Sequence, residues 1–112
     1  MTISEFFSKY NLHDSLLENI NYDEKRRIIT LEIDFCYWLQ ENYTGDMPET
    51  GMITLIFSNV IKFDYTPFSI NSDEIISVNN NSDGRLYLEF FNDITEECHS
   101  LCIIAEQVEI VE

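Results

Sequence analysis

Three consecutive side chains, His13, Asp14 and Ser15, are of the types that build a hydrolytic triad. A triad needs its nucleophile, base and orienting acid to converge from separate parts of a fold, and sequence neighbours cannot face one another in that way. We therefore expect a polar turn here, in which Asp14 or Ser15 bonds local backbone amides. His13 could instead donate a hydrogen bond that fixes the corner. We assign His13 and Asp14 a structural role.

A second chemically capable group, near the end of the chain, comprises Cys98, His99 and Cys102. Zinc sites need four ligands, commonly supplied as two closely spaced pairs. The other candidates, Cys36 and His13, have no partner at such a spacing. If the segment is a strand, His99 points away from the face that the two cysteines share. We expect no metal site, and no local pattern supports thiol catalysis by Cys36 and His99.

Asn79, Asn81 and Asp83, followed by Gly84, match the first half of a calcium-binding EF-hand loop. That loop requires a bidentate acid at its twelfth position, which here is Phe90, and it requires flanking helices. The flanking segments have the composition of strands. Because an Asp-Gly step supplies the positive φ that tight hairpins need, we interpret this segment as a hairpin turn.

The charge of the chain is its most unusual property: 21 acids face 6 bases in 112 residues, a formal net charge of −15. Such a charge repels nucleic acid and anionic membranes and favours basic protein surfaces. The three glycines are scattered, so no phosphate-binding loop exists, and no basic patch carries interleaved aromatics. We expect no cofactor, no nucleic acid and no membrane as partners.

The same composition predicts a folded chain. Apolar residues make up 45%, enough for a hydrophobic core despite the charge, and the length suits one domain spanning residues 1–112. The chain has no apolar run of membrane-spanning length and no signal-peptide pattern at its start. Three cysteines, an odd number, suggest reduced thiols, with Cys36 filling core space. We expect a cytoplasmic monomer or small homo-oligomer.

Local patterns predict one short helix followed by strands. Thr2 and Glu5 have the spacing of a capping box and place a helix at about 3–10. Alternating apolar residues and turn signals then predict about seven strands. Their ranges are 16–22, 27–38, 52–65 (continuous or broken near Ser58), 75–78, 86–91, 97–105 and 107–111. The predicted fold is mainly β (α+β), an antiparallel sandwich or curved roll with one N-terminal helix.

The clearest alternation lies in the strand at 27–38. It sends one set of side chains to the core, namely Ile29, Leu31, Ile33, Phe35 and Tyr37. The other set points outward, namely Thr30, Glu32, Asp34 and Cys36. Trp38, at the end of the strand, continues the outward set.

The loop after this strand, 40–51, holds three acids and no base. Exposed tryptophan and tyrosine serve as anchors in protein interfaces, with charged residues around them. The predicted partner-binding residues are therefore Trp38, Glu41, Tyr43, Asp46 and Glu49, flanked by Glu32 and Asp34. A second interpretation stays open, in which Trp38 caps the edge of the core and the loop is only solvated.

Two stretches carry a family resemblance. Leu12-His13-Asp14-Ser15-Leu16-Leu17, followed by a turn and the alternating strand from Ile28 to Phe35, resembles the opening of small bacterial immunity-protein families of polymorphic toxin systems. The resemblance covers about residues 12–37. It implies a cytoplasmic, non-enzymatic inhibitor of a cognate toxin. Only the structural His13-Asp14 step is carried over, because such families place their interfaces differently.

These observations leave three hypotheses. The first is an acidic, non-enzymatic binding protein, most concretely an immunity- or antitoxin-like inhibitor of a basic partner such as a nuclease toxin. The second is a structural or assembly module whose acidity serves solubility. The third is an enzyme with carboxylate acid–base chemistry, which would need a cleft holding two acids of shifted pKa. The sequence shows no nucleophile, metal or cofactor motif for the third.

Overall fold

The computed structural model describes residues 1–65, 70–81 and 83–112. These residues form one α-helix, one 3-10 helix and six strands, and every strand pair is antiparallel. The helices are α1 (Ile3–Lys9) and η1 (Tyr37–Leu39). The strands are β1 (Leu16–Asp23), β2 (Ile28–Cys36), β3 (Thr50–Tyr65), β4 (Asp73–Asn80), β5 (Arg85–Asn92) and β6 (Glu97–Val111).

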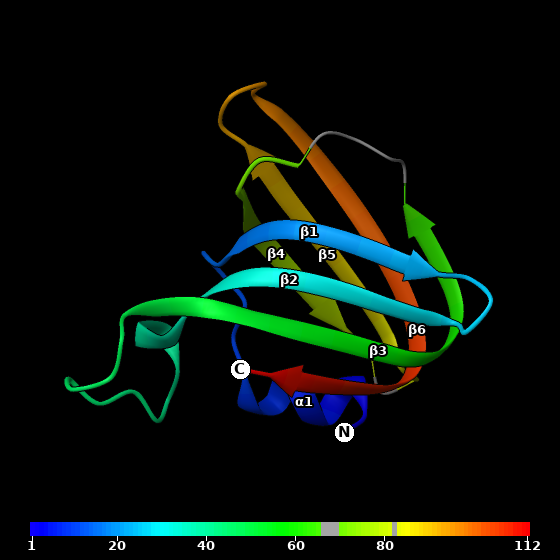
Figure 1. Cartoon of the computed structure of the whole chain (residues 1–112), viewed down its shortest axis with the longest axis horizontal. Helices are drawn as coiled ribbons and strands as arrows, with labels where there is room; N and C mark the ends of the chain where they lie inside the picture. The colour runs from blue at the N-terminus through cyan, green and yellow to red at the C-terminus, as the bar shows by residue number, and fades with distance from the viewer. Residues whose placement is uncertain (66–69, 82) are drawn as a thin grey trace.

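The strands close into a barrel in the order β1-β2-β3-β6-β5-β4. In Figure 1, β1, β2 and β3 cross the front, β4, β5 and the first half of β6 cross the back, and α1 lies below, beside the end of β6. The predicted class is confirmed: a mainly β, antiparallel, curved architecture with one short N-terminal helix. The strand predicted at 107–111 is not separate, because β6 continues through it to Val111.

The capping box that predicted α1 is present. The Glu5 amide donates to Thr2 Oγ1 at 3.1 Å, and the Thr2 amide donates to Glu5 Oε1 at 3.0 Å. The helix ends at Lys9, before the predicted end, because Tyr10 adopts an extended backbone with φ −124°. Ile3 and Phe6 are fully buried, so one face of α1 joins the barrel core.

The alternation predicted for β2 sets the core. Ile29, Leu31, Ile33 and Phe35 are all buried, as predicted. Tyr37 is only half-buried, because the chain leaves the strand at Cys36 and turns into η1. Cys36 lies at an outward position but is buried, because the chain before β1 covers it. The prediction that Cys36 is buried is therefore confirmed, although it lies at an outward position of the strand.

The remaining turn predictions are met by specific backbone features. β3 runs unbroken past Ser58, where Asn59 takes a positive φ of 52° and a bulge follows at Val60/Lys62. The hairpin predicted around Gly84 joins β4 to β5, and Gly84 has φ +86°. An added Cβ there would lie 2.6 Å from the Ala105 carbonyl oxygen, so this position needs glycine.

Candidate functional site

The candidate site begins where β2 turns into η1. The Trp38 amide donates to the Glu49 carbonyl oxygen at 3.2 Å, so the two ends of the loop are held together beside the indole. The Trp38 side chain is 49% exposed. The Tyr37 hydroxyl reaches Glu112 Oε2 at 3.4 Å. This end of the barrel thus presents an exposed aromatic with acids around it.

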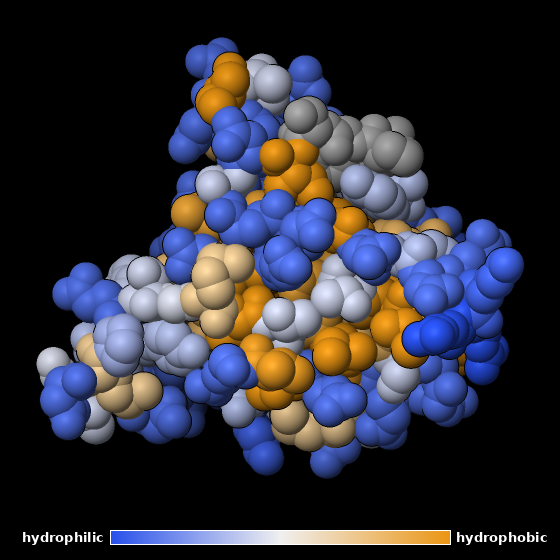
Figure 2. Space-filling view, in the orientation of Figure 1, coloured by the Kyte–Doolittle hydropathy of each residue, from blue (hydrophilic) through white to orange (hydrophobic). Residues whose placement is uncertain are grey.

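Strand register places further side chains on the same outer face. Asp34 lies between Leu16 of β1 and Met52 of β3, and Met52 is 54% exposed. In the next row Thr54 pairs with Glu32 on one side and with Val111, which is 48% exposed, on the other. Figure 2 shows apolar side chains reaching the surface in the middle of this face, bordered by polar ones. The face therefore combines exposed apolar groups with carboxylates.

Cys36 lies beneath this face and cannot serve as a nucleophile there. Burial raises the pKa of the Cys36 thiol, and the nearby carboxylates of Asp14 and Asp34 raise it further, against hydrogen bonds from Ser15 and Trp38. Its Sγ donates to the Asp14 carbonyl oxygen at 3.3 Å. A protonated, buried thiol is a packing group.

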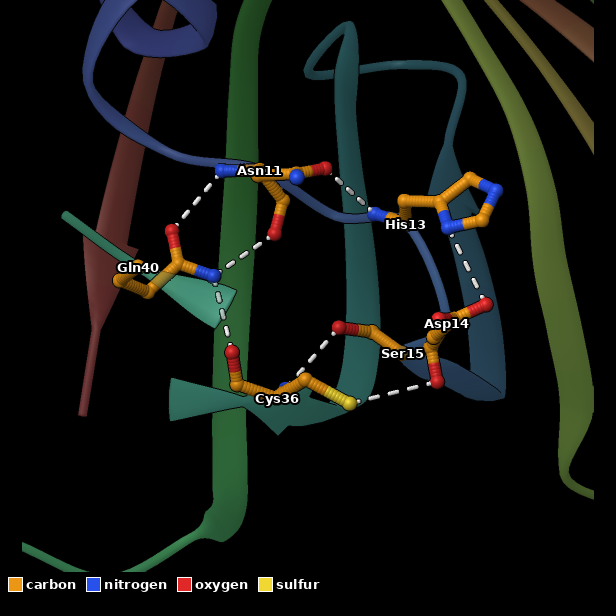
Figure 3. A network of polar contacts seen from close by, with 6 residues as sticks. All are labelled: Asn11, His13, Asp14, Ser15, Cys36 and Gln40. Atoms are coloured by element: carbon orange, nitrogen blue, oxygen red, sulfur yellow. Dashed lines mark hydrogen bonds and ion pairs between the residues drawn. The ribbon is translucent and has the colours of Figure 1, made fainter. Parts of the chain in front are cut away.

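A buried amide side chain fixes η1 against the segment before β1. Gln40 Nε2 donates to the carbonyl oxygens of Asn11, at 2.8 Å, and Cys36, at 2.9 Å. Gln40 Oε1 accepts from the Asn11 amide at 2.9 Å (Figure 3). One side chain thus satisfies three backbone groups. No sequence pattern predicts this role for Gln40, since Asn11 lies 29 residues away and no periodicity links the two residues.

The His13-Asp14-Ser15 step is not a triad. His13 Nδ1 lies 3.1 Å from Asp14 Oδ1, whereas Ser15 Oγ is turned away and accepts from the Cys36 amide at 3.0 Å (Figure 3). Ser15 does bond a backbone amide, but on β2 and not locally. Asp14 has a positive φ of 66°, and its amide donates to the Ile75 carbonyl oxygen at 3.0 Å. The three residues hold a corner where β1 meets β2 and β4.

Two carboxyl groups meet at this corner. Burial raises the pKa of Glu74, and a hydrogen bond with Asp14 and the charges of Asp14 and Asp93 raise it further, while His13 opposes them. The folded structure therefore favours the protonated form of Glu74 more than the unfolded chain does. Neither Asp14 nor Glu74 lines any of the three grooves beside α1.

The other predicted loop residues have separate environments. Glu41 lines an open groove of about 330 Å³ with Lys9 and Tyr10. Tyr43 is half-buried, and its hydroxyl donates to the Met47 carbonyl oxygen at 3.5 Å. A hydrogen bond from Thr44 lowers the pKa of Asp46. The loop is thus ordered by its own contacts.

The structure therefore divides the predicted residues into two groups. Asp34 and Glu32 share the outer face of β2, Trp38 follows just beyond the end of that strand, and the Glu49 carbonyl accepts from the Trp38 amide. Glu41 faces the α1 groove instead, and Tyr43 and Asp46 belong to the protruding part of the loop, seen at the left of Figure 1.

The bases are gathered at the opposite end of the barrel. Lys25, Arg26 and Arg27 form the β1–β2 turn, and Lys62 and Arg85 both pair with Ile104. The nine residues of β2 separate that turn from η1, a distance of about 30 Å. The sixth base, Lys9, lies beside Glu41 in the α1 groove. In the part of the chain that the structure describes, no base lies in the rows of Asp34 and Glu32.

One buried polar pair escaped the sequence analysis. Asp73 and Asn92 are buried at adjacent inward positions of β4 and β5, and Asn92 Nδ2 donates to Asp73 Oδ1 at 2.9 Å. Asp73 Oδ2 has no hydrogen-bond partner. The alternation through Leu88 and Phe90 points to Asn92, but the predicted strands stopped one residue short of it on β5 and two short on β4.

Several general features complete the description. Cys36, Cys98 and Cys102 are free thiols. Within residues 1–65, 70–81 and 83–112, no cluster of three or more His, Cys, Asp or Glu side chains is arranged to hold a metal ion. Over the same residues, no helix has both the length and the apolar character needed to cross a bilayer. Comparison with protein-family models, curated proteins and solved structures finds no significant match to this chain.

Proposed function

We propose that this protein is a non-enzymatic, acidic binding protein of the cytoplasm that inhibits a basic protein partner, in the manner of an immunity protein or antitoxin. The observation that carries the proposal is the half-exposed Trp38 at the end of β2, a strand whose outer face bears carboxylates and no base among the described residues. A nuclease toxin is the most concrete partner, because nucleases need cationic surfaces to bind phosphates.

The two kinds of side chain on this face have different tasks. Carboxylates such as Glu32, Asp34 and Glu49 speed the encounter with a cationic surface and fix its orientation. Exposed apolar groups, above all Trp38 and Met52, lose water on contact and slow dissociation. Inhibition follows from covering the basic surface, without any chemical step.

The separation of charge along the barrel supports one orientation of binding. With five bases at the β1–β2 end, the molecule is most negative at the η1 end. A cationic partner is therefore steered toward Trp38 and away from Arg26 and Arg27. Rim charges act mainly on the association rate, so the effect should fall steeply with ionic strength.

The test is capture of a partner from host lysate by wild type and by two matched double variants. Trp38→Ala with Glu49→Lys alters the proposed face, and Tyr87→Ala with Glu24→Lys makes the same kinds of change elsewhere on the surface. We expect a basic protein that is retained at low salt and released at high salt by wild type and by the control. The variant of the proposed face should lose it.

A functional readout completes the experiment. If the captured protein has nuclease activity, wild type should suppress it and the Trp38→Ala/Glu49→Lys variant should not. Equal capture by both double variants would remove this face from the proposal. Capture of no basic protein, from a lysate in which neighbouring gene products are expressed, would contradict the function itself.

A further inference from the structure

The unpaired edge of β4 is a second surface with the properties of a binding site. On one side β4 pairs with β5 along its whole length. On the other side β1 pairs only with Asp73 and Glu74, and the last bond of this seam joins the Ile75 amide to the Ser15 carbonyl oxygen at 2.9 Å. Beyond Ile75, no strand of the described chain adjoins this side of β4.

The alternating direction of the backbone hydrogen bonds along β4 identifies its free backbone groups. The Asn81 amide donates to the Arg85 carbonyl oxygen at 2.9 Å, and Asn79 pairs with Tyr87 two residues further along. Alternate residues of an antiparallel strand direct their backbone groups to the same side, so Asn81 and Asn79 bond to β5. Val78 and Asn80 therefore direct theirs to the open side, and no described backbone group bonds to them there.

A small hollow adjoins these free groups. It has a volume of about 190 Å³. Its lining consists of Phe7, Tyr10, Asn11, Leu12, Val78 and Asn80. Sites for drug-sized molecules have volumes of about 300–1,000 Å³, so this hollow suits a single side chain better. Strand addition requires free strand backbone, whose hydrogen bonds give affinity, and an adjoining hollow, which gives specificity.

Charge decides which segment this edge would accept. The edge begins beside Asp14 and Glu74, with Asp93 nearby and His13 bound to Asp14. A second copy of this chain, with its own charge of −15, would be repelled. A segment that carries lysine or arginine would place those charges on the Asp14–Glu74 pair. Lys9, the nearest base, lines the neighbouring groove and not this hollow.

We propose that the β4 edge at Ser77–Asn80 binds an extended basic segment of a protein partner as an added strand. One side chain of the segment enters the hollow, and a lysine or arginine reaches Asp14 and Glu74. The basic character of the partner rests on the proposed function, whereas the strand edge and the hollow stand independently of it.

The test uses a defined probe: a capped eight-residue peptide of alternating lysine and valine, with a glutamate–valine peptide as its charge control. NMR titration and amide exchange should show binding, with exchange of the Val78 and Asn80 amides slowed at least tenfold. Val78→Pro removes one of the free N–H groups, and proline is tolerated on strand edges that face solvent. It should weaken binding at least tenfold, whereas Val78→Thr, which keeps the N–H, should not.

A second variant keeps the test decisive if Val78→Pro fails to fold. Asp14→Asn with Glu74→Gln leaves the edge intact and should weaken binding of the lysine peptide several-fold. Protection away from β4, equal binding by Val78→Pro, or equal binding of the glutamate peptide would overturn the proposal. The proposal would also be overturned if wild type sediments as a dimer and Val78→Pro as a monomer, because the edge would then bind a second copy of this chain.

The two proposals fail in different ways. If Val78→Pro captures the same basic protein from lysate as wild type does, the proposed function stands and the edge proposal is overturned. If no basic protein is captured but the lysine peptide protects Val78 and Asn80, the edge proposal stands and the proposed function is contradicted.

Discussion

Two strand pairs that close the barrel, β3–β6 and β1–β4, form seams of very different kinds. Between β3 and β6, pairing runs from Thr54 to Tyr65, and the inward side chains along it are apolar and buried, as at Leu55 and Phe57. Between β1 and β4, only Leu16 and Leu17 are paired, and their partners are the acids Glu74 and Asp73. The first seam resembles a continuous sheet, whereas the second depends on a few polar contacts.

The difference shows how this chain divides stability from recognition. Apolar packing along β3 and β6 tolerates many substitutions of similar volume and needs no particular partner atom. Around β1 and β4, buried polar atoms need specific partners, such as Gln40 for Asn11 and Ser15 for the Cys36 amide. The candidate surface on the β4 edge lies beside the polar seam, whereas Trp38 lies beyond the end of β2.

The largest expected effect comes from breaking the apolar seam. Leu55→Ala removes a fully buried side chain from the middle of β3 and leaves a cavity. We expect a loss of about 2–5 kcal/mol in the free energy of unfolding, measured by chemical denaturation. Thr54→Ala, on the outer face of the same strand, is the control and should change it by less than about 0.5 kcal/mol. Similar losses for both would mean that β3 is not the centre of the core.

A smaller effect is expected from Gln40→Ala, which acts on the segment that leads into the polar seam. It deprives the Asn11 amide and carbonyl and the Cys36 carbonyl of their partner, although water can reach part of this site. We expect the free energy of unfolding to fall by about 2 kcal/mol and amide exchange at Asn11 to become faster. Gln107→Ala, at an exposed position of β6, is the matched control. Unchanged exchange at Asn11 would show that the loop is held by other contacts.

Ser15→Ala tests the same seam through a single bond. The buried Cys36 amide loses its hydrogen bond to Ser15 Oγ. We expect this to lower the free energy of unfolding by about 1–2 kcal/mol. Ser100→Ala, exposed on β6, should have almost no effect. Thermal unfolding of both variants gives the comparison. A Ser15→Ala protein as stable as wild type would indicate that the Cys36 amide finds water.

The two seams also differ in how far the sequence predicts them. Period-two alternation identified β2 and its core set because burial of alternate residues such as Leu31 and Ile33 is a local property. The hairpin at Gly84 followed from turn chemistry, and α1 followed from Thr2 and Glu5.

Barrel closure could not be predicted in the same way. It depends on which strands meet, and the β1–β4 seam is marked by no run of residues. Of the site, the exposure of Trp38 was one of two open interpretations, and the side chain is 49% exposed in η1, beyond the end of β2. The role of Gln40 was missed, because its partner Asn11 is distant in sequence and no pattern connects them.

The smallest expected effect concerns the pH dependence of the polar seam. The pKa of Glu74 is raised above its ordinary value of 4.5 by burial first, and then by Asp14 and Asp93. A carboxyl whose pKa is raised in the folded state favours folding in its protonated form. Its contribution is complete below the pKa of the unfolded chain and is lost as the pH rises through the folded pKa.

Protection of the Ile75 amide, which bonds to Ser15 across the seam, should therefore decrease as the pH rises from 4 toward neutrality. Acidification also relieves the repulsion among the other carboxylates, so wild type alone is not diagnostic. Glu74→Gln keeps a neutral donor at every pH and should flatten this dependence, whereas Glu32→Gln, on the open outer face, should leave it unchanged. If Glu74→Gln and Glu32→Gln respond alike, the Asp14–Glu74 bond does not control the seam, and net charge alone explains the effect.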